Sequence, residues 1–313
     1  MLRTIGRKTG AARMEDVARR AGVSTTTVSR IVHTPDKVSE RTRRRVLRAI
    51  TKTGYVHNLV AGSLASNRTQ VIAAIVPTIN NPAYGKTIHA MSEVLRKDGY
   101  HLLLGHHGFS VAEEESLIAA FLGRRPDGML LHGRRHSPGA IRLLRNAHIP
   151  IVELGDLTGR PLDMVVSYSN FEAAKQLTAY LLSKGYQRIA FVCEPMRASE
   201  RHYQRWRGYR AALRQHGHAY RATRVIETPF GYHKGAEALL ALLARDPAID
   251  AVFFTSDVMA VGAQLECVRR GWDVPGKIAI AGFDDQEIAS EAVPALTTVQ
   301  VPREEIGRLA AQM

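Results

Sequence analysis

The chain has 313 residues, of which 45% are hydrophobic, so it can bury a sizeable core and is too long for one simple domain. Its net charge of +14 is unevenly placed, because residues 1–68 hold 15 Lys and Arg against four Asp and Glu, whereas the other 245 residues hold 28 against 25. This concentration favours a polyanion-binding segment over an ordinary solvated basic face, since neutralising phosphates releases counterions. Cys193 and Cys267 lie far apart and have no CxxC partner, which argues against a disulfide framework and indicates a reducing cytoplasm.

The N-terminal segment carries no targeting signal that we identify. Residues 1–13 contain no apolar run long enough for a signal peptide, and no stretch of the chain is long enough to cross a membrane. We expect these 13 residues to form a flexible basic arm, unless the start codon has been assigned too early. The expected location is the cytoplasm, in association with the nucleoid and without a membrane partner.

Residues 14–57 predict three short helices around a small aliphatic core. Gly22 permits a sharp turn between the first two helices, and Ser24 and Ser39 are placed to cap the second and third. This order of helices, with a tight glycine turn, predicts a helix-turn-helix DNA-binding domain. The residues expected to face its core are Val17, Ala18, Ala21, Val23, Val28, Ile31, Val32, Val46, Leu47 and Ile50.

The second helix begins with three threonines, which are mediocre helix formers and are rarely chosen for a buried face. Small hydroxyl side chains let a helix approach DNA closely, Thr can contact base edges or the thymine methyl, and Arg can bind guanine. A serine at the helix start suits a phosphate contact. The alternative, a helical hairpin with ordinary polar exposure, is disfavoured by the neighbouring arginines. The predicted DNA-binding residues are Ser24, Thr25, Thr26, Thr27, Ser29 and Arg30.

The segment MEDVARRAGVSTTTVSRIVHTPDKVSERTRRRVLRAITKTGYVHNLVAGSLA closely resembles the headpiece of lactose-repressor-type (LacI/GalR) transcription regulators. The resemblance implies that Thr25 and Thr26 read bases and that Arg30 faces the groove. It also implies a hinge helix and linker at 58–69, with Asn58 at its start and Leu64 wedged into a central minor-groove step. The alternative for Leu64 is a linker leucine packed against the core.

From residue 70 onward, short apolar runs alternate with helical stretches, which predicts parallel sheets covered on both faces. Two such series, split near residue 168, predict two doubly wound subdomains with a ligand cleft outside the carboxyl ends of the strands. The resemblance covers nearly the whole chain and implies a periplasmic-binding-protein-like effector and dimerisation domain at 70–313. The expected strands are 71–76, 100–105, 127–132, 149–154, 164–168, 188–192, 225–228, 251–255 and 277–283, and the expected helices lie near 84–97, 112–124, 138–147, 202–216, 234–245 and 258–270.

Loops that follow these strands supply the candidate effector residues. By motif, three positions match the sugar-contacting positions of the family: Arg205 in RxxGY, Ser256 in SDxMAxGA and Asp284 in GFDD. An Arg and an Asp in one cleft suit a carboxylate or vicinal hydroxyl groups. The alternative for Arg205 is a surface salt bridge, and Asp257 is expected to cap its own helix instead of contacting the ligand. The full predicted effector set is Tyr84, His107, His132, Arg134, Asn170, Arg205, Ser256 and Asp284.

Several segments, among them NPAYGKTIHAMSEVLRKDGYHLLLGHHGF, resemble the gluconate-operon repressor branch of the family in particular. The expected cleft loops are rich in arginine and imidazole, which suit a sugar acid. We therefore expect gluconate or a related aldonate as effector, with no cofactor. A metal site at His132 and His136 is disfavoured, because their segment follows a strand instead of lying on a helix.

The predicted function is a repressor of sugar-acid utilisation genes that binds a palindromic operator as a homodimer and is released by its effector. No dinucleotide fingerprint, P-loop or nucleophile elbow indicates an enzyme, so no catalytic residue is predicted. The alternatives are a different sugar or a corepressor as ligand, a secreted sugar-binding protein and a non-specific DNA binder. Relative to the family the chain stops early, inside an expected helix, which leads us to expect a truncated end and puts dimerisation in doubt.

Overall fold

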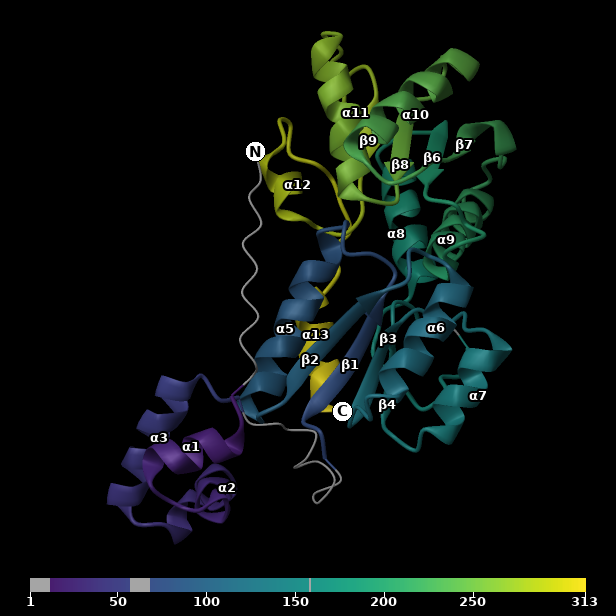
Figure 1. The fold of residues 1–313 in the computed structure, drawn as a ribbon. Coiled ribbons are helices and arrows are strands. Elements are labelled where there is room, and N and C mark those ends of the chain that lie inside the picture. The colour runs from purple at the N-terminus through teal and green to yellow at the C-terminus, as the bar shows by residue number, and fades with distance from the viewer. Residues whose placement is uncertain (1–11, 57–67, 158) are drawn as a thin grey trace, which may run out of the picture. The chain divides into compact units, whose positions relative to one another are not determined.

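The computed structural model describes residues 12–56, 68–157 and 159–313. The chain divides into two compact units, Met1–Thr69 and Gln70–Met313 (Figure 1). Most of the predicted arm and of the predicted hinge segment, including Asn58 and Leu64, lies outside the described residues. In the described part of the chain, no helix is long and apolar enough to span a membrane.

The first unit is the predicted helix-turn-helix, formed by α1 (Met14–Ala21), α2 (Thr25–His33) and α3 (Glu40–Thr53), with a single 3-10 turn at Pro35–Lys37. Gly22 ends α1 with a φ of 59°, a conformation that glycine adopts without steric cost. The three helices share one core, in which Val17, Val28 and Val46 are fully buried.

Two details of α3 differ from the prediction. Leu47 is 46% exposed, because a rotation of about 100° per residue carries it away from the inner face that Val46 and Ala49 occupy. Ser39 stands at the N-cap position, but its hydroxyl bonds the hydroxyl of Thr42 at 3.0 Å and no backbone N–H of the helix.

The second unit contains two all-parallel sheets, as the alternating pattern predicted (Figure 1). The five-stranded sheet has the order β2-β1-β3-β4-β5, and the four-stranded sheet has the order β7-β6-β8-β9. The strands are β1 (Val71–Val76), β2 (His101–His106), β3 (Gly128–His132), β4 (Ile151–Leu154), β5 (Met164–Val165), β6 (Ile189–Cys193), β7 (Val225–Glu227), β8 (Ala251–Phe254) and β9 (Ala279–Ala281).

Helices cover both faces of each sheet. Alternate residues of β1 show this, because Ala73 and Ile75 pack in one cluster with α6 and α7, while Ala74 packs in another with α5 and α13. The helices of this unit are α5 (Ala83–Lys97), α6 (Val111–Leu122), α7 (Pro138–Asn146), α8 (Asn170–Ser183), α9 (Glu200–Gln215), α10 (Tyr232–Arg245), α11 (Asp257–Arg269), α12 (Glu287–Glu291) and α13 (Arg303–Gln312), and a 3-10 turn lies at Ala222–Arg224.

A single division near residue 168 does not describe this unit fully. After the second sheet the chain returns to the first, where Ile306 and Ala310 of α13 join the cluster that contains Ala74 and Met91. The helix α8, which packs against the second sheet, is also absent from the predicted elements. The chain therefore builds most of the first subdomain, then the second subdomain, and finally adds α13 to the first.

Candidate functional site

The exposed face of α2 is small and polar. Thr25, Thr26 and Arg30 are exposed and Ser29 is half-buried, while Val28 and Ile31 on the opposite face are buried in the core. This arrangement leaves the hydroxyl groups and the guanidinium of α2 free to meet another polar surface.

Ser24 and Thr27 stabilise the start of α2. The Ser24 hydroxyl accepts a hydrogen bond from the Thr27 backbone N–H at 3.2 Å and lies 2.9 Å from the Thr27 hydroxyl. The pair therefore caps the helix, and Thr27 is less available to an external partner than Thr25 or Thr26.

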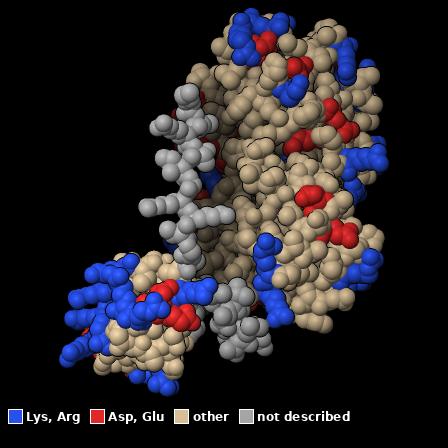
Figure 2. Space-filling view, in the orientation of Figure 1, with Lys and Arg blue, Asp and Glu red and all other residues tan. Residues whose placement is uncertain are grey.

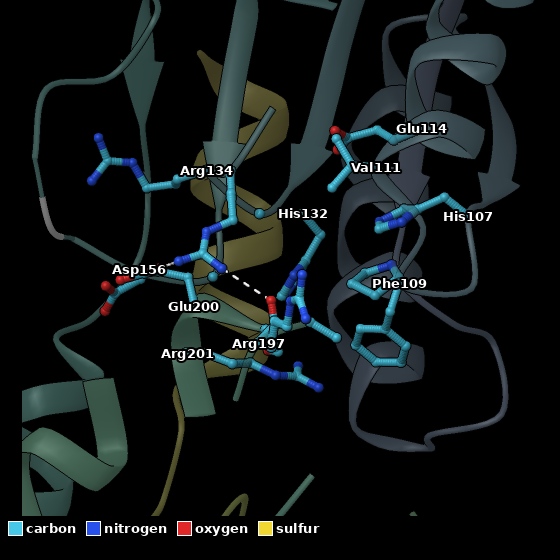
Figure 3. Close-up of a pocket in the computed structure, with 16 residues that line it drawn as sticks. His107, Phe109, Val111, Glu114, His132, Arg134, Asp156, Arg197, Glu200 and Arg201 are labelled. Atoms are coloured by element: carbon cyan, nitrogen blue, oxygen red, sulfur yellow. Dashed lines mark hydrogen bonds and ion pairs between the residues drawn. The ribbon is translucent and has the colours of Figure 1, made fainter. Parts of the chain in front are cut away.

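In the second unit, a cavity of about 130 Å³ lies at the carboxyl ends of β1, β2, β3 and β4 (Figure 3). This is the edge where parallel strands place the loops that bind ligands. Its opposite wall comes from residues 197–201, which connect β6 to α9 and begin that helix. The lining residues are Pro77, His107, Phe109, Val111, Glu114, His132, Gly133, Arg134, Arg135, Gly155, Asp156, Arg197, Ala198, Ser199, Glu200 and Arg201.

Of the predicted effector residues, His107, His132 and Arg134 line this cavity. Burial lowers the pKa of His107 and lowers that of His132 well below its ordinary value, with Arg201 adding to the effect at His132. Both imidazoles are therefore neutral at pH 7, so they can donate or accept hydrogen bonds but supply no charge.

Arg134 lines the cavity with the base of its side chain and turns its guanidinium away from His132 and Phe109 (Figure 3). Its Nε lies 3.8 Å from Glu153 Oε1, and its side chain is 9% exposed. The guanidinium therefore balances a buried carboxylate instead of facing the cavity.

Behind the cavity, His136 lies between two buried carboxylates. Its Nδ1 is 2.9 Å from Glu114 Oε2, and its Nε2 is 3.4 Å from Glu153 Oε1. These two carboxylates outweigh the cost of burial and raise the pKa of His136 to about 9. Among the described residues, no three His, Cys, Asp or Glu side chains lie close enough together to hold a metal ion.

Arg205 is buried, 2% exposed, so the surface salt-bridge alternative is wrong. Its Nε donates to Asn170 Oδ1 at 2.8 Å and its Nη2 donates to the Tyr168 hydroxyl at 2.9 Å. Its Nη1 donates to the Thr255 carbonyl at 2.7 Å, and the guanidinium stacks 3.6 Å from the centre of the Phe283 ring. Each guanidinium nitrogen of Arg205, the arginine that the family motif assigns to the effector, therefore already donates a hydrogen bond to a protein group.

Asp284 and Ser256 lie in the same buried region. Asp284 accepts a hydrogen bond from Arg303 and lies 3.8 Å from Arg205. The Ser256 hydroxyl is buried and forms no hydrogen bond with a described residue. Neither residue lines the cavity that His132 borders.

Asp257 does not cap its own helix, so the capping role expected from the sequence is wrong. It stands at the first position of α11, where its carboxylate accepts hydrogen bonds from the Gln286 N–H at 2.7 Å and the Thr298 hydroxyl at 2.5 Å. Burial raises the pKa of Asp257 to about 6. Its carboxylate therefore joins α11 to the chain around α12.

Tyr84 connects the two subdomains through Arg201. The Arg201 Nη1 donates to the Tyr84 hydroxyl, and its guanidinium lies 5.2 Å from the centre of the Tyr84 ring. The same ring packs edge-on against His132, with 4.7 Å between the ring centres. Tyr84 therefore borders the cavity through residues that line it.

The cavity is also lined by Arg135, Arg197 and Arg201, which lie in strand-end loops that the sequence indicated but are absent from the predicted effector set. Arg135, from the loop after β3, donates to the Arg197 carbonyl at 3.0 Å and pairs with Glu200 at 3.1 Å. These contacts join the first sheet's loops to the start of α9 (Figure 3). The run RASER at 197–201 belongs to a predicted cleft loop, but the family motif directed the prediction to Arg205 of the same segment instead of to this wall.

The exposed polar face of α2 and the strand-end cavity define the class of protein: a helix-turn-helix DNA-binding unit joined to a small-molecule sensor unit. Comparison with known families agrees, since residues 13–58 match "Bacterial regulatory proteins, lacI family" and residues 178–313 match "Periplasmic binding protein-like domain".

Relatives and solved structures identify the family. The chain is 32% identical to the HTH-type transcriptional regulator GntR of Escherichia coli K12, over 96% of this chain and 89% of that protein. It is 37% identical to the regulator of the same name from Pseudomonas aeruginosa, over 98% and 89%. A LacI-family regulator from Silicibacter pomeroyi superposes with a TM-score of 0.89 at 33% identity, over 96% and 90%. The chain therefore belongs to the LacI family of bacterial transcriptional regulators, whose members are regulators and not enzymes.

Proposed function

We propose that the chain represses sugar-acid utilisation genes by binding a palindromic operator, with Thr25, Thr26, Ser29 and Arg30 of α2 reading one half-site. The observation that carries this proposal is the exposed polar face of α2 above a buried aliphatic face. Ser24 and Thr27 fix the start of the helix and bring its N-terminal end toward the phosphates.

Two copies of the chain are needed to occupy both half-sites of such an operator, so we propose a homodimer. Asn58 and Leu64 belong to the segment that the family resemblance assigns to the central minor groove. Leu64 would wedge between base pairs there and bend the duplex.

The effector that we propose is gluconate or a related aldonate, bound in the cavity at the strand ends. Arg135 and Arg201 lie on its walls and can pair with a carboxylate, while neutral His107 and His132 can bond hydroxyl groups. The resemblance of several segments to the gluconate-operon repressor branch supports the same ligand class.

The other predicted effector residues support the cavity from behind its lining, and the guanidinium of Arg134, although Arg134 lines the cavity, does the same. Asn170, Arg205 and Asp284 form a saturated buried network, and Arg134 pairs with Glu153. We propose that these residues hold the binding loops in place, with Tyr84 coupled to the cavity through Arg201. The Ser256 hydroxyl, which bonds no described residue, is one that a ligand in a rearranged cleft could engage.

Effector binding would then change how the two subdomains meet, because Arg135 and Arg201 bond groups on the opposite side. A coupling of about 1–3 kcal/mol per effector would lower operator affinity five- to 150-fold. The direction, induction instead of corepression, follows the gluconate-like branch.

A titration tests these proposals together. Purified protein is titrated against short duplexes from its own upstream region, with and without gluconate, at two salt concentrations. Specific binding that weakens with gluconate is expected. Specific binding that ignores gluconate would discard the ligand and keep the regulator, and binding without sequence preference would overturn the operator reading.

A further inference from the structure

The helix-turn-helix unit carries a second basic surface, away from the residues of α2. A groove runs between α1 and α3, lined by Arg20 of α1 and by seven residues of α3, with no lining residue from α2. We refer to it as the α1–α3 groove. Its members are Arg20, Glu40, Arg41, Arg44, Arg45, Arg48, Ala49 and Lys52.

The α1–α3 groove is lined mainly by positively charged side chains. Six of its eight lining residues are cationic, and Glu40, its single carboxylate, is already paired with Arg44 at 2.9 Å. Arg20, Arg41, Arg48 and Lys52 are exposed and form no ion pair with a described residue. Elsewhere the exposed arginines on helices often have a carboxylate three or four positions away, as Arg96, Arg269 and Arg270 do.

The spacing of the cations follows one side of α3. Arg41, Arg44, Arg48 and Lys52 recur at intervals of three or four residues, so they form a stripe along the helix. At 1.5 Å per residue the stripe is about 16 Å long, which spans about five phosphates of one DNA strand along the helix axis. Figure 2 shows the basic side chains gathered over this unit.

The groove faces a different direction from the base-reading side of α2. All three helices surround one core, and Thr26 and Arg30 project from α2 on the side opposite Val28, while Thr25 is exposed at the start of the helix. The outer groove between two helices of such a trio faces away from the third. A straight duplex seated on α2 therefore leaves the α1–α3 groove open.

We propose that the α1–α3 groove binds the phosphate backbone of a second DNA segment while α2 holds its half-site. The side chains suit this partner, since guanidinium and ammonium groups bind phosphate without reading sequence. An operator-bound regulator would then capture a neighbouring duplex and bridge the two segments.

The test is capture of a second duplex. The 313-residue chain is bound to an excess of immobilised upstream duplex, so that α2 is occupied, and a labelled 20-base-pair duplex of unrelated sequence is added. The triple variant Arg41→Gln, Arg48→Gln and Lys52→Gln removes three groove cations and keeps helix-forming side chains. The matched control, Arg142→Gln, Arg145→Gln and Arg214→Gln, removes three exposed cations from the other unit.

The expected result is that wild type and control capture the second duplex, whereas the groove variant captures at least tenfold less and keeps operator affinity within about threefold. Capture by the groove variant at the control level would overturn the proposal and leave a solvated face. Loss of operator affinity, with a salt slope lower by up to about three, would also overturn it, because the groove would then contact the operator itself. A circular-dichroism melt shows that both variants are folded. Because α2 is unchanged, specific operator binding tests the proposed function separately.

Discussion

His136 carries a proton at neutral pH because two buried carboxylates hold its imidazole. Its pKa of about 9 in the folded chain lies above the 6.5 expected when the chain is unfolded. Protonation therefore stabilises the fold, fully below pH 6.5 and progressively less as the pH rises through 9. Together with Arg134, the charged imidazole of His136 therefore balances Glu114 and Glu153 beside the cavity.

His136→Gln tests this linkage. The variant should lose on the order of 3 kcal/mol of stability at pH 6, because Glu114 loses the imidazolium and Glu153 keeps only Arg134 as a partner. The difference from wild type should shrink as the pH rises from 7 to 10. Urea unfolding of both proteins across this range measures it, and a constant difference would show that His136 does not titrate as described.

Arg205 provides a second test at the scale of one residue. Arg205→Met should destabilise the chain by about 3–5 kcal/mol, because Asn170 and Tyr168 lose a buried partner. Arg214→Met, on an exposed turn of the same helix, should stay within about 0.5 kcal/mol of wild type. Thermal unfolding compares the two, and equal effects would refute the assigned role of Arg205.

The helices α10 and α11 pack closely against each other at two glycines, Gly235 and Gly262. A Cβ on Gly262 would lie 1.9 Å from the Tyr232 carbonyl oxygen, and one on Gly235 would lie 1.9 Å from that of Met259. Neither glycine has an unusual φ, so close packing and not backbone conformation requires them.

Gly262→Ala should therefore force the two helices apart and cost about 1–3 kcal/mol. Gly85→Ala is the matched control, because Gly85 is exposed on α5 with open space where its Cβ would stand. That change should stabilise the chain by about 0.5–1 kcal/mol. Unfolding midpoints of the two variants should move in opposite directions, and movement in the same direction would contradict the packing argument.

Local patterns predicted the elements well and their long-range partners poorly. Serines at helix starts, such as Ser110 and Ser137, accept hydrogen bonds from the first turn, and so the predicted boundaries of α6 and α7 lie within one or two residues of those observed. The return of α13 to the first sheet could not be predicted, since it depends on which distant apolar face remains uncovered.

The candidate site shows the same limit. Strand-end loops placed His107 and His132 at the cavity, because parallel strands bring their carboxyl ends to one edge. Motif positions did not show that Asn170 and Tyr168 already satisfy Arg205, or that Arg134 turns toward Glu153. The orientation of a long side chain depends on tertiary neighbours that a motif does not contain.

For the whole molecule, binding of the effector should stabilise one unit and leave the other unchanged. Gluconate at 100 times its dissociation constant should add about 2.7 kcal/mol to the unit formed by 70–313, which raises its unfolding temperature by roughly 5–10 °C. The transition of the helix-turn-helix unit should not move. Differential scanning calorimetry with gluconate, and with uncharged glucose as control, distinguishes the two, and an equal shift with glucose would refute a carboxylate requirement.

The position of α13 has a consequence for synthesis on the ribosome. Residues 170–296 supply the strands β6 to β9 of the second sheet and the helices packed on them, so this half can fold as soon as it emerges. The first half is made earlier, yet one face of its sheet waits for Ile306 and Ala310, which follow roughly ten seconds or more later at ordinary translation rates. During that interval we expect the apolar surface around Ala74 and Met91 to be open to chaperones until α13 covers it.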